Sequence, residues 1–173
     1  MLVRRAAGHR RRRAGGRIRP PLVIDDGGRK AAGFRGEAGD CACRALAIAW
    51  GKPYREVYDR LNEFIKDREP YYRGKVGFAH ATGRGSSSRT GVHKRTFDEF
   101  LDNIDAPWTP CMKIGTGCRV HVRTGDLPAT GRYILRLSKH FAAWIDGVLH
   151  DTYDSSREGT RCVYGYWTLE GTR

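Results

Sequence analysis

Long apolar runs are missing from this chain of 173 residues. No stretch approaches the roughly 20 apolar residues that a membrane-spanning helix needs. The first residues also lack the apolar core of a secretory signal. The sequence therefore predicts no membrane association and a cytoplasmic location. It contains no internal repeat and no phosphate-binding loop motif.

Cysteine is scarce, and its spacing is poor for binding a metal. None of the five cysteines belongs to a Cys-x-x-Cys pair, and the six histidines show no close spacing to match. We therefore expect neither a metal nor another cofactor. The odd count and the missing secretory signal favour reduced thiols over disulfides. The cysteines are Cys41, Cys43, Cys111, Cys118 and Cys162.

Acidic residues are absent from residues 1–19, which hold eight arginines. The whole chain carries a net charge of +13, from 32 Lys and Arg against 19 Asp and Glu. A basic arm of this kind is a candidate contact for the phosphates of nucleic acid, and a solvated tail is the alternative. We expect a disordered basic arm over residues 1–33 and one domain with its own core over residues 34–173.

Helical patterning is concentrated in the first part of the predicted domain. Residues 41–50 are apolar around most of a helix circumference, which predicts a buried helix with Asp40 as its N-cap and Gly51 as its stop. Apolar residues at helical spacing predict a second helix over 53–67.

Two further features follow the second helix. Residues 67–92 show no period and contain many Gly and Ser residues, which predicts a long irregular loop. A third helix is expected over 96–104, where Thr96 and Glu99 have the spacing of a capping box.

Apolar and polar residues alternate through the last third of the chain, which is typical of strands. Helices followed by strands indicate an α+β domain, with N-terminal helices packed on an antiparallel sheet. The predicted strands cover residues 118–124, 132–138, 140–146, 148–153 and 162–169.

The dipeptide Asp146-Gly147 between two apolar runs predicts a two-residue hairpin turn. That turn places Ile145 opposite Val148. Side chains that lie opposite each other share a face of the sheet, and faces alternate along each strand. His140 and Asp151 then project from the same face as diagonal neighbours, about 7 Å apart. A carboxylate that holds one imidazole nitrogen leaves the other free to act as a base.

Cys41 stands at the start of the first predicted helix, directly after Asp40. The helix dipole and the unpaired N–H groups of a first turn favour a thiolate there. A Cys-His-Asp arrangement follows if the sheet brings His140 against that helix end. Cys43 is the rival nucleophile, but it lies about 200° around the helix from Cys41, so we expect it in the core.

These residues occur in the stretches "GDCACRALAIAWGKPYREVYDRL" and "KHFAAWIDGVLHDTYD". In these two motifs the chain resembles the papain-like cysteine peptidase superfamily, most closely its bacteriocin-processing branch, and also a set of uncharacterised phage and bacterial proteins. The resemblance extends over roughly residues 34–168 and implies a papain-like fold. It implies that Cys41 is the nucleophile, His140 the base and Asp151 the orienting acid. The implied reaction is hydrolysis of a peptide or related amide through an acyl-enzyme, with a peptide or protein as substrate.

One position departs from the superfamily pattern. Papain-like enzymes commonly carry a Gln about six residues before the nucleophile, where its amide helps to hold the oxyanion, and this chain has Arg35 there. The oxyanion donors that we expect are the backbone N–H of Cys41 and, with less suitable geometry, the side chain of Arg35.

A second function belongs to a different class. A non-enzymatic, phage-type accessory protein with this fold would bind nucleic acid or a protein partner through its basic arm. The distance between Cys41 and His140 separates the two hypotheses.

Overall fold

The computed structural model describes residues 19–72 and 86–170. The predicted arm up to residue 18 and part of the predicted loop, residues 73–85, lie outside the described residues. The helices are α1 (Cys41–Trp50), α2 (Tyr54–Tyr72) and α3 (Lys94–Asn103). The strands are β1 (Leu22–Ile24), β2 (Trp108–Pro110), β3 (Arg132–Leu137), β4 (His140–Ile145), β5 (Val148–Asp151) and β6 (Gly165–Leu169).

The strands form one six-stranded sheet in the order β1-β5-β4-β3-β6-β2. Every neighbouring pair is antiparallel except β1 and β5, which run parallel. The prediction of an α+β domain is confirmed. The expected purely antiparallel sheet is wrong, because the three residues of β1 were too short a run to be recognised as a strand and they add to the edge in parallel.

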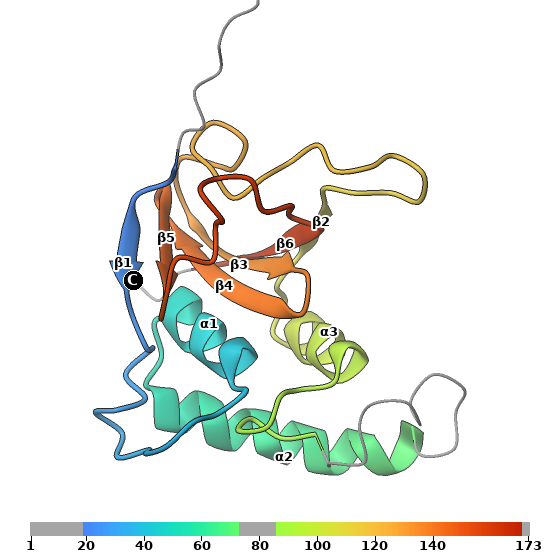
Figure 1. The fold of residues 1–173 in the computed structure, drawn as a ribbon. Helices are drawn as coiled ribbons and strands as arrows, with labels where there is room; N and C mark the ends of the chain where they lie inside the picture. The colour runs from blue at the N-terminus through green and yellow to red at the C-terminus, as the bar shows by residue number, and fades with distance from the viewer. Residues whose placement is uncertain (1–18, 73–85, 171–173) are drawn as a thin grey trace, which may run out of the picture.

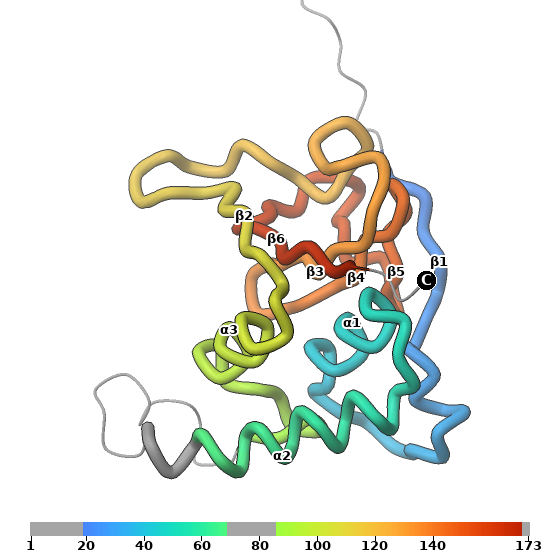
Figure 2. Tube along the Cα trace, turned by 180° about the vertical axis from the view of Figure 1, so that it is seen from behind, coloured from blue at the N-terminus to red at the C-terminus, as the bar shows by residue number. Residues whose placement is uncertain are grey.

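All three helices lie on one side of the sheet, and the long loops around residues 111–131 and 152–164 lie on the other (Figures 1 and 2). Two apolar clusters fill the two sides. The first joins the helices to Ile134, Ala143 and Trp167, and the second gathers under the loops around Leu135 and Trp144. Within the described ranges, no helix combines the length and the apolar character needed to cross a bilayer.

Helix α1 lies against β4 and β3 and is buried on most sides, as its composition predicted. Gly51 ends it in the left-handed conformation, with φ of 72°. Arg132 of β3 donates hydrogen bonds to the last carbonyls of the helix, from Nε to Ala49 O at 2.7 Å and from Nη2 to Ile48 O at 2.6 Å. A cation on these carbonyls also complements the negative end of the helix dipole.

The ends of the other two helices differ from the predictions. Helix α2 continues to Tyr72, so the irregular segment begins later than residue 67. Helix α3 begins at Lys94 with His93 as its N-cap, and no side-chain cap is present. The predicted capping box at Thr96 and Glu99 is therefore wrong. Thr96 is fully buried inside the first turns of α3, where it cannot occupy the N-cap position.

One strand prediction and one boundary prediction also need correction. Residues 118–124 alternate in polarity but form only isolated bridges, between His121 and Cys162 and between Thr124 and Leu127. The predicted boundary after residue 33 does not coincide with the start of the sheet, because β1 lies upstream of it. Asp25, directly after β1, donates its N–H to Asp151 O at 2.9 Å.

Cys118 and Cys162 form a disulfide, with their Cα atoms 5.8 Å apart. The expectation of reduced thiols is wrong for this pair. The bridge between His121 and Cys162 aligns the two segments and brings the cysteines within disulfide range. Cys41, Cys43 and Cys111 are free thiols.

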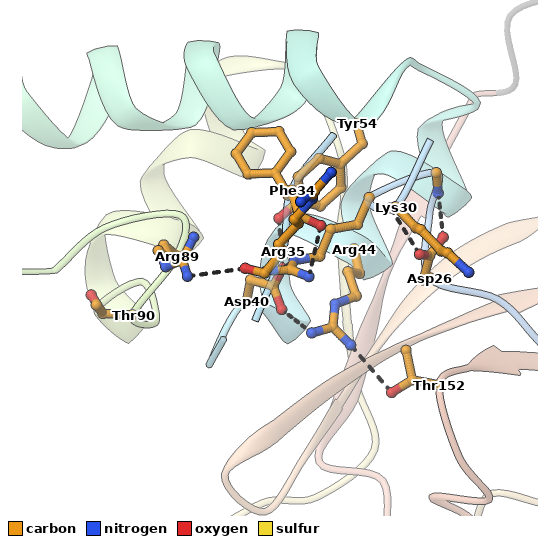
Figure 3. Close-up of polar contacts among 12 residues, drawn as sticks. Asp26, Lys30, Phe34, Arg35, Asp40, Arg44, Tyr54, Arg89, Thr90 and Thr152 are labelled. Carbon is orange, nitrogen blue, oxygen red and sulfur yellow. Dashed lines mark hydrogen bonds and ion pairs between the residues drawn. The ribbon is translucent and has the colours of Figure 1, made fainter. Parts of the chain in front are cut away.

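The carboxylate of Asp40 is completely buried at the start of α1. Figure 3 shows how the side chains of Arg44 and Tyr54 converge on it. Arg44 pairs with Oδ1, Arg29 Nε lies 2.9 Å from Oδ2, and the Tyr54 hydroxyl donates to Oδ2 at 2.5 Å. Two guanidinium groups and a phenol therefore compensate the desolvated charge, and together they fix the backbone that precedes Cys41.

Replacing this carboxylate tests how much the fold depends on it. We expect Asp40→Asn to lower the free energy of unfolding by about 3 to 5 kcal/mol, because two guanidinium groups lose their buried counter-charge. Asp67→Asn removes the same charge from an exposed position on α2 and is expected to change stability by less than about 0.5 kcal/mol. Urea unfolding followed by circular dichroism measures both. Equal stability of the two variants would contradict the assigned role of Asp40.

Candidate functional site

The predicted hairpin forms with the register expected from the sequence. Ile145 pairs with Val148, and the register continues to Ala143 opposite His150. Both turn residues have positive φ, 47° at Asp146 and 82° at Gly147, as a two-residue hairpin turn requires. The hairpin therefore forms as predicted. Its register determines which side chains meet at its open end, away from the turn.

His140 and Asp151 meet at that open end. His140 Nε2 lies 2.6 Å from Asp151 Oδ2, and Asp151 Oδ1 accepts a hydrogen bond from the N–H of Thr152 at 2.7 Å. Both side chains are nearly buried, with exposed fractions of 11% and 8%. Both carboxylate oxygens are therefore engaged, and the ring of His140 is held in one orientation with Nδ1 as its remaining nitrogen.

Cys41 completes this arrangement from the other side of the cleft. It is the first residue of α1, it is only half-buried, and it lines the same cavity as His140, whose pKa its neighbouring thiol helps to raise. Since Asp151 holds Nε2, Nδ1 is the nitrogen left for the thiol. The structure thus brings Cys41, His140 and Asp151 together, as the sequence analysis expected.

Burial, hydrogen bonding and charge act on His140 in opposite directions. Burial of the ring lowers the pKa of His140, but the hydrogen bond to Asp151 and the charges of Asp151 and Cys41 raise it, and the net result is a pKa of about 9. The ordinary value is 6.5. The imidazolium form is therefore favoured at neutral pH, which is the proton donor that an amide leaving group requires.

Cys43 occupies the core, as predicted. Its side chain is completely buried, and burial raises the pKa of its thiol to about 12. Burial also raises the pKa of Cys111. Neither thiol faces the cleft, so Cys41 is the free thiol placed beside an imidazole.

A cavity of about 420 Å³ lies in front of Cys41 and His140. Its described walls come from the start of α1, the segment that leads into α3, the β3–β4 turn and Tyr164. Gly39 permits this packing, because a Cβ there would stand 2.9 Å from the carbonyl oxygen of Thr90. Ser88 anchors the same segment on α2, by donating from Oγ to Tyr58 O at 3.0 Å and from its N–H to Asn62 Oδ1 at 2.9 Å.

Asp40 occupies the N-cap position of α1 but makes no cap hydrogen bond with its side chain. The prediction of a capping role is therefore wrong, because both carboxylate oxygens are turned toward Arg29, Arg44 and Tyr54. The N–H groups of a first helical turn have no partner within the helix. In α1 they are left without the usual carboxylate cap, at the end of the helix where Cys41 lines the cavity.

Arg35 does not reach the cleft. It is absent from the described residues that line the cavity, and its side chain is exposed. Its carbonyl oxygen accepts hydrogen bonds from Arg29 Nη2 at 3.2 Å and Arg89 Nη2 at 3.1 Å (Figure 3). The expected contribution of its side chain to an oxyanion site has no support in this geometry, which leaves the backbone N–H of Cys41.

Arg44 was not recognised from the sequence, yet it connects the helix to the sheet at this site. It pairs with Asp40 and donates from Nη1 to Thr152 Oγ1 at 3.3 Å (Figure 3). Thr152 in turn donates its N–H to Asp151. A continuous series of contacts therefore links the residue before Cys41 to the carboxylate that orients His140. An arginine four residues after an aspartate was the available signal, but it indicated only an ordinary helical ion pair.

Among the described residues, no three His, Cys, Asp or Glu side chains gather as ligands of a metal ion. Comparisons of the chain with family models, with curated proteins and with solved structures gave no match in any of the three.

The effect of Asp151 on His140 is directly measurable. We expect Asp151→Asn to lower the pKa of His140 from about 9 to 6.5 or below, because burial persists while the carboxylate charge is lost. Nuclear magnetic resonance titration of the imidazole carbons gives this value. Asp25→Asn is the matched control, since Asp25 Oδ2 faces His150 Nδ1 at 3.4 Å and does not contact the ring of His140.

The same shift has a consequence for stability. A pKa raised in the folded state stabilises the protein fully below the unfolded value of 6.5, and this contribution is lost as the pH rises through about 9. Asp151→Asn should therefore unfold with a weaker pH dependence between these two values. An unchanged His140 titration in Asp151→Asn would contradict the assigned pairing.

Proposed function

We propose that this protein is a thiol hydrolase that cleaves a peptide or related amide bond with Cys41, His140 and Asp151. One observation carries the proposal. A half-buried cysteine at a helix start and a histidine whose Nε2 is held by a buried carboxylate line one cavity. A papain-like fold accounts for the same arrangement, with the cysteine helix packed on the strand that carries the histidine.

The reaction begins with attack of the Cys41 sulfur on the carbonyl carbon of the substrate amide. The oxygen takes up negative charge as the C–S bond forms, and the N–H of Cys41 at the helix start is placed to donate to it. His140, as the imidazolium, then gives its proton to the leaving nitrogen as the C–N bond breaks. The amine departs and a thioester remains on Cys41.

Water completes the cycle. His140, now neutral, accepts a proton from a water molecule, whose oxygen attacks the thioester carbon. The C–S bond breaks, the carboxylic acid leaves, and the thiolate–imidazolium pair is restored. Asp151 keeps the ring oriented through both steps and stabilises its charged form. An amine in place of water would give acyl transfer from the same intermediate.

Selective alkylation tests this proposal. In wild-type protein at neutral pH we expect iodoacetamide to modify Cys41 at least roughly tenfold faster than a free thiol of cysteine, because ion pairing with His140 stabilises the thiolate. Mass spectrometry of the tryptic peptides measures the rate at each cysteine. Cys111 is an internal control, since it is a free thiol that does not line the cavity and whose pKa is raised by burial.

Two variants separate reactivity from exposure. Cys41→Ala should leave only slow labelling, and His140→Gln should reduce the rate at Cys41 to that of an ordinary thiol. Labelling of Cys41 no faster than free cysteine, unchanged in His140→Gln, would rule out the proposed nucleophile.

The basic N-terminal segment supports a second candidate function in a different class. Eight arginines without an acidic residue in residues 1–19 favour contact with nucleic-acid phosphates. This accessory function does not require the cavity at Cys41, so the two proposals are independently testable.

We expect the full chain to bind duplex DNA with an affinity that falls steeply as the salt concentration rises. Deletion of residues 1–18 should abolish most of this dependence, while Cys41→Ala should leave it intact. Arg19 is retained in the deletion because it pairs with Asp154 at 2.8 Å. Fluorescence anisotropy at several salt concentrations measures the effect, and equal binding by the shortened chain would exclude the arm as the contact.

A further inference from the structure

The described walls of the cavity carry three cations and no carboxylate. Lys94 lies at the start of α3, Arg136 near the end of β3, and Lys139 in the β3–β4 turn beside His140. The remaining lining residues are apolar or neutral apart from His140 itself. The electrostatic potential in front of Cys41 is therefore positive, which raises the local concentration of anions.

Arg136 is the most deeply placed of these cations. Its side chain is only 16% exposed, and its guanidinium carbon lies 5.6 Å from the ring centre of Trp108 and 6.0 Å from that of Trp167. Register places it opposite Phe141, on the face of the sheet that the helices cover. Packing against these rings keeps the planar group in one position.

The guanidinium of Arg136 is poorly satisfied for a group with so little exposure. Its one ion pair within the described ranges is with Asp98, and the distance from Nη1 to Oδ1 is 3.6 Å, too long for a hydrogen bond. No oxygen of the described residues accepts a hydrogen bond from it. A mostly buried guanidinium with open donors is suited to bind an acceptor, and Arg136 lines the cavity, where these donors are accessible.

Asp98 carries a counter-charge but is only loosely paired with Arg136. Burial and the neighbouring charges of Asp102 and Glu99 raise the pKa of Asp98 to about 6. Its Oδ1 is buried and has no hydrogen-bond partner. The pair therefore leaves Arg136 available for a second, better placed carboxylate.

We propose that this cavity selects substrates with a carboxylate close to the scissile bond, and that Arg136 binds that carboxylate with support from Lys94 and Lys139. The inference rests on the amide-cleaving function proposed above and names its substrate class. A guanidinium presents two parallel N–H groups that match the two oxygens of a carboxylate, whereas the two lysines add charge without that geometry. The carboxylate comes either from an acidic side chain or from the end of a peptide chain.

A pair of alkylating reagents tests the charge preference without a known substrate. Iodoacetate and iodoacetamide form the same bond to sulfur, but only iodoacetate carries a carboxylate. We measure the ratio of their rates at Cys41, normalised to the ratio for free cysteine. The positive cavity should raise this normalised ratio to about five or more, as expected for a charged hydrogen bond in a partly wet site.

Four variants of the full chain locate the cause. Arg136→Gln should lower the normalised ratio at least about threefold, and Lys94→Gln should lower it less. Asp98→Asn should raise it, because the competing counter-charge is removed. Lys66→Gln, which removes an exposed charge on α2, is the matched control and should leave the ratio unchanged. If Arg136→Gln does not fold, the opposite responses of Lys94→Gln and Asp98→Asn decide the question.

Peptide libraries identify the source of the carboxylate. Cleavage beside Asp or Glu in libraries with both free and amidated C termini indicates an acidic side chain. Cleavage near the end of free peptides alone indicates the terminal carboxylate. A normalised ratio near one, unchanged in Arg136→Gln and Asp98→Asn, overturns the carboxylate site. Slow alkylation of Cys41 by both reagents instead contradicts the proposed nucleophile, so the two failures are distinguishable.

Discussion

The buried carboxylate of Asp40 is the interaction on which the position of Cys41 depends. A charge with no exposed surface is stable only because Arg29, Arg44 and Tyr54 supply cations and a hydroxyl donor. These partners come from the segment before α1, from α1 itself and from the start of α2. The carboxylate therefore joins three parts of the chain at the residue that directly precedes the thiol.

This arrangement also determines what the start of α1 offers to a ligand. A side chain that serves two guanidinium groups and a phenol cannot also cap the helix, and Asp40 makes no cap hydrogen bond. The first-turn N–H groups therefore have no carboxylate cap, and Cys41 and Ala42 of this turn line the cavity. At the opposite end Arg132 satisfies the carbonyls of Ile48 and Ala49. The last carbonyls of the helix are thus paired, whereas the N–H groups at the end where chemistry is proposed have no side-chain cap.

The parts of the structure that were predictable from the sequence were those determined by local rules. Asp146-Gly147 specified the hairpin register, and that register brought His140 to Asp151 by counting residues. The apolar composition of residues 41–50 and the helical spacing of apolar residues after residue 53 located the first two helices, and Gly51 marked the end of the first. In each of these cases the deciding residues lie within a few positions of one another, so the sequence contains the whole constraint.

The errors arose where distant residues decide the outcome. Asp40 has the residue type of an N-cap. Only the folded chain shows that its carboxylate binds partners elsewhere in the chain and does not cap the helix. Residues 118–124 alternate like a strand but have no neighbouring strand to continue the pairing. The disulfide between Cys118 and Cys162 spans 44 positions. Arg136 has no local signature at all, since its significance lies in the aromatic rings and the missing acceptor around it.

Strand β1 has a consequence for association between molecules. It pairs along β5 as far as Asp151, and without it the backbone groups of β5 would form an open edge. Strands from other chains can pair with an open edge. A short edge strand such as the three residues of β1 is a common protection against this pairing. The opposite edge of the sheet also offers little backbone for pairing, because β2 is short and ends at Pro110. Residues 22–24 thus occupy the place beside Asp151 that a strand of another molecule would otherwise take.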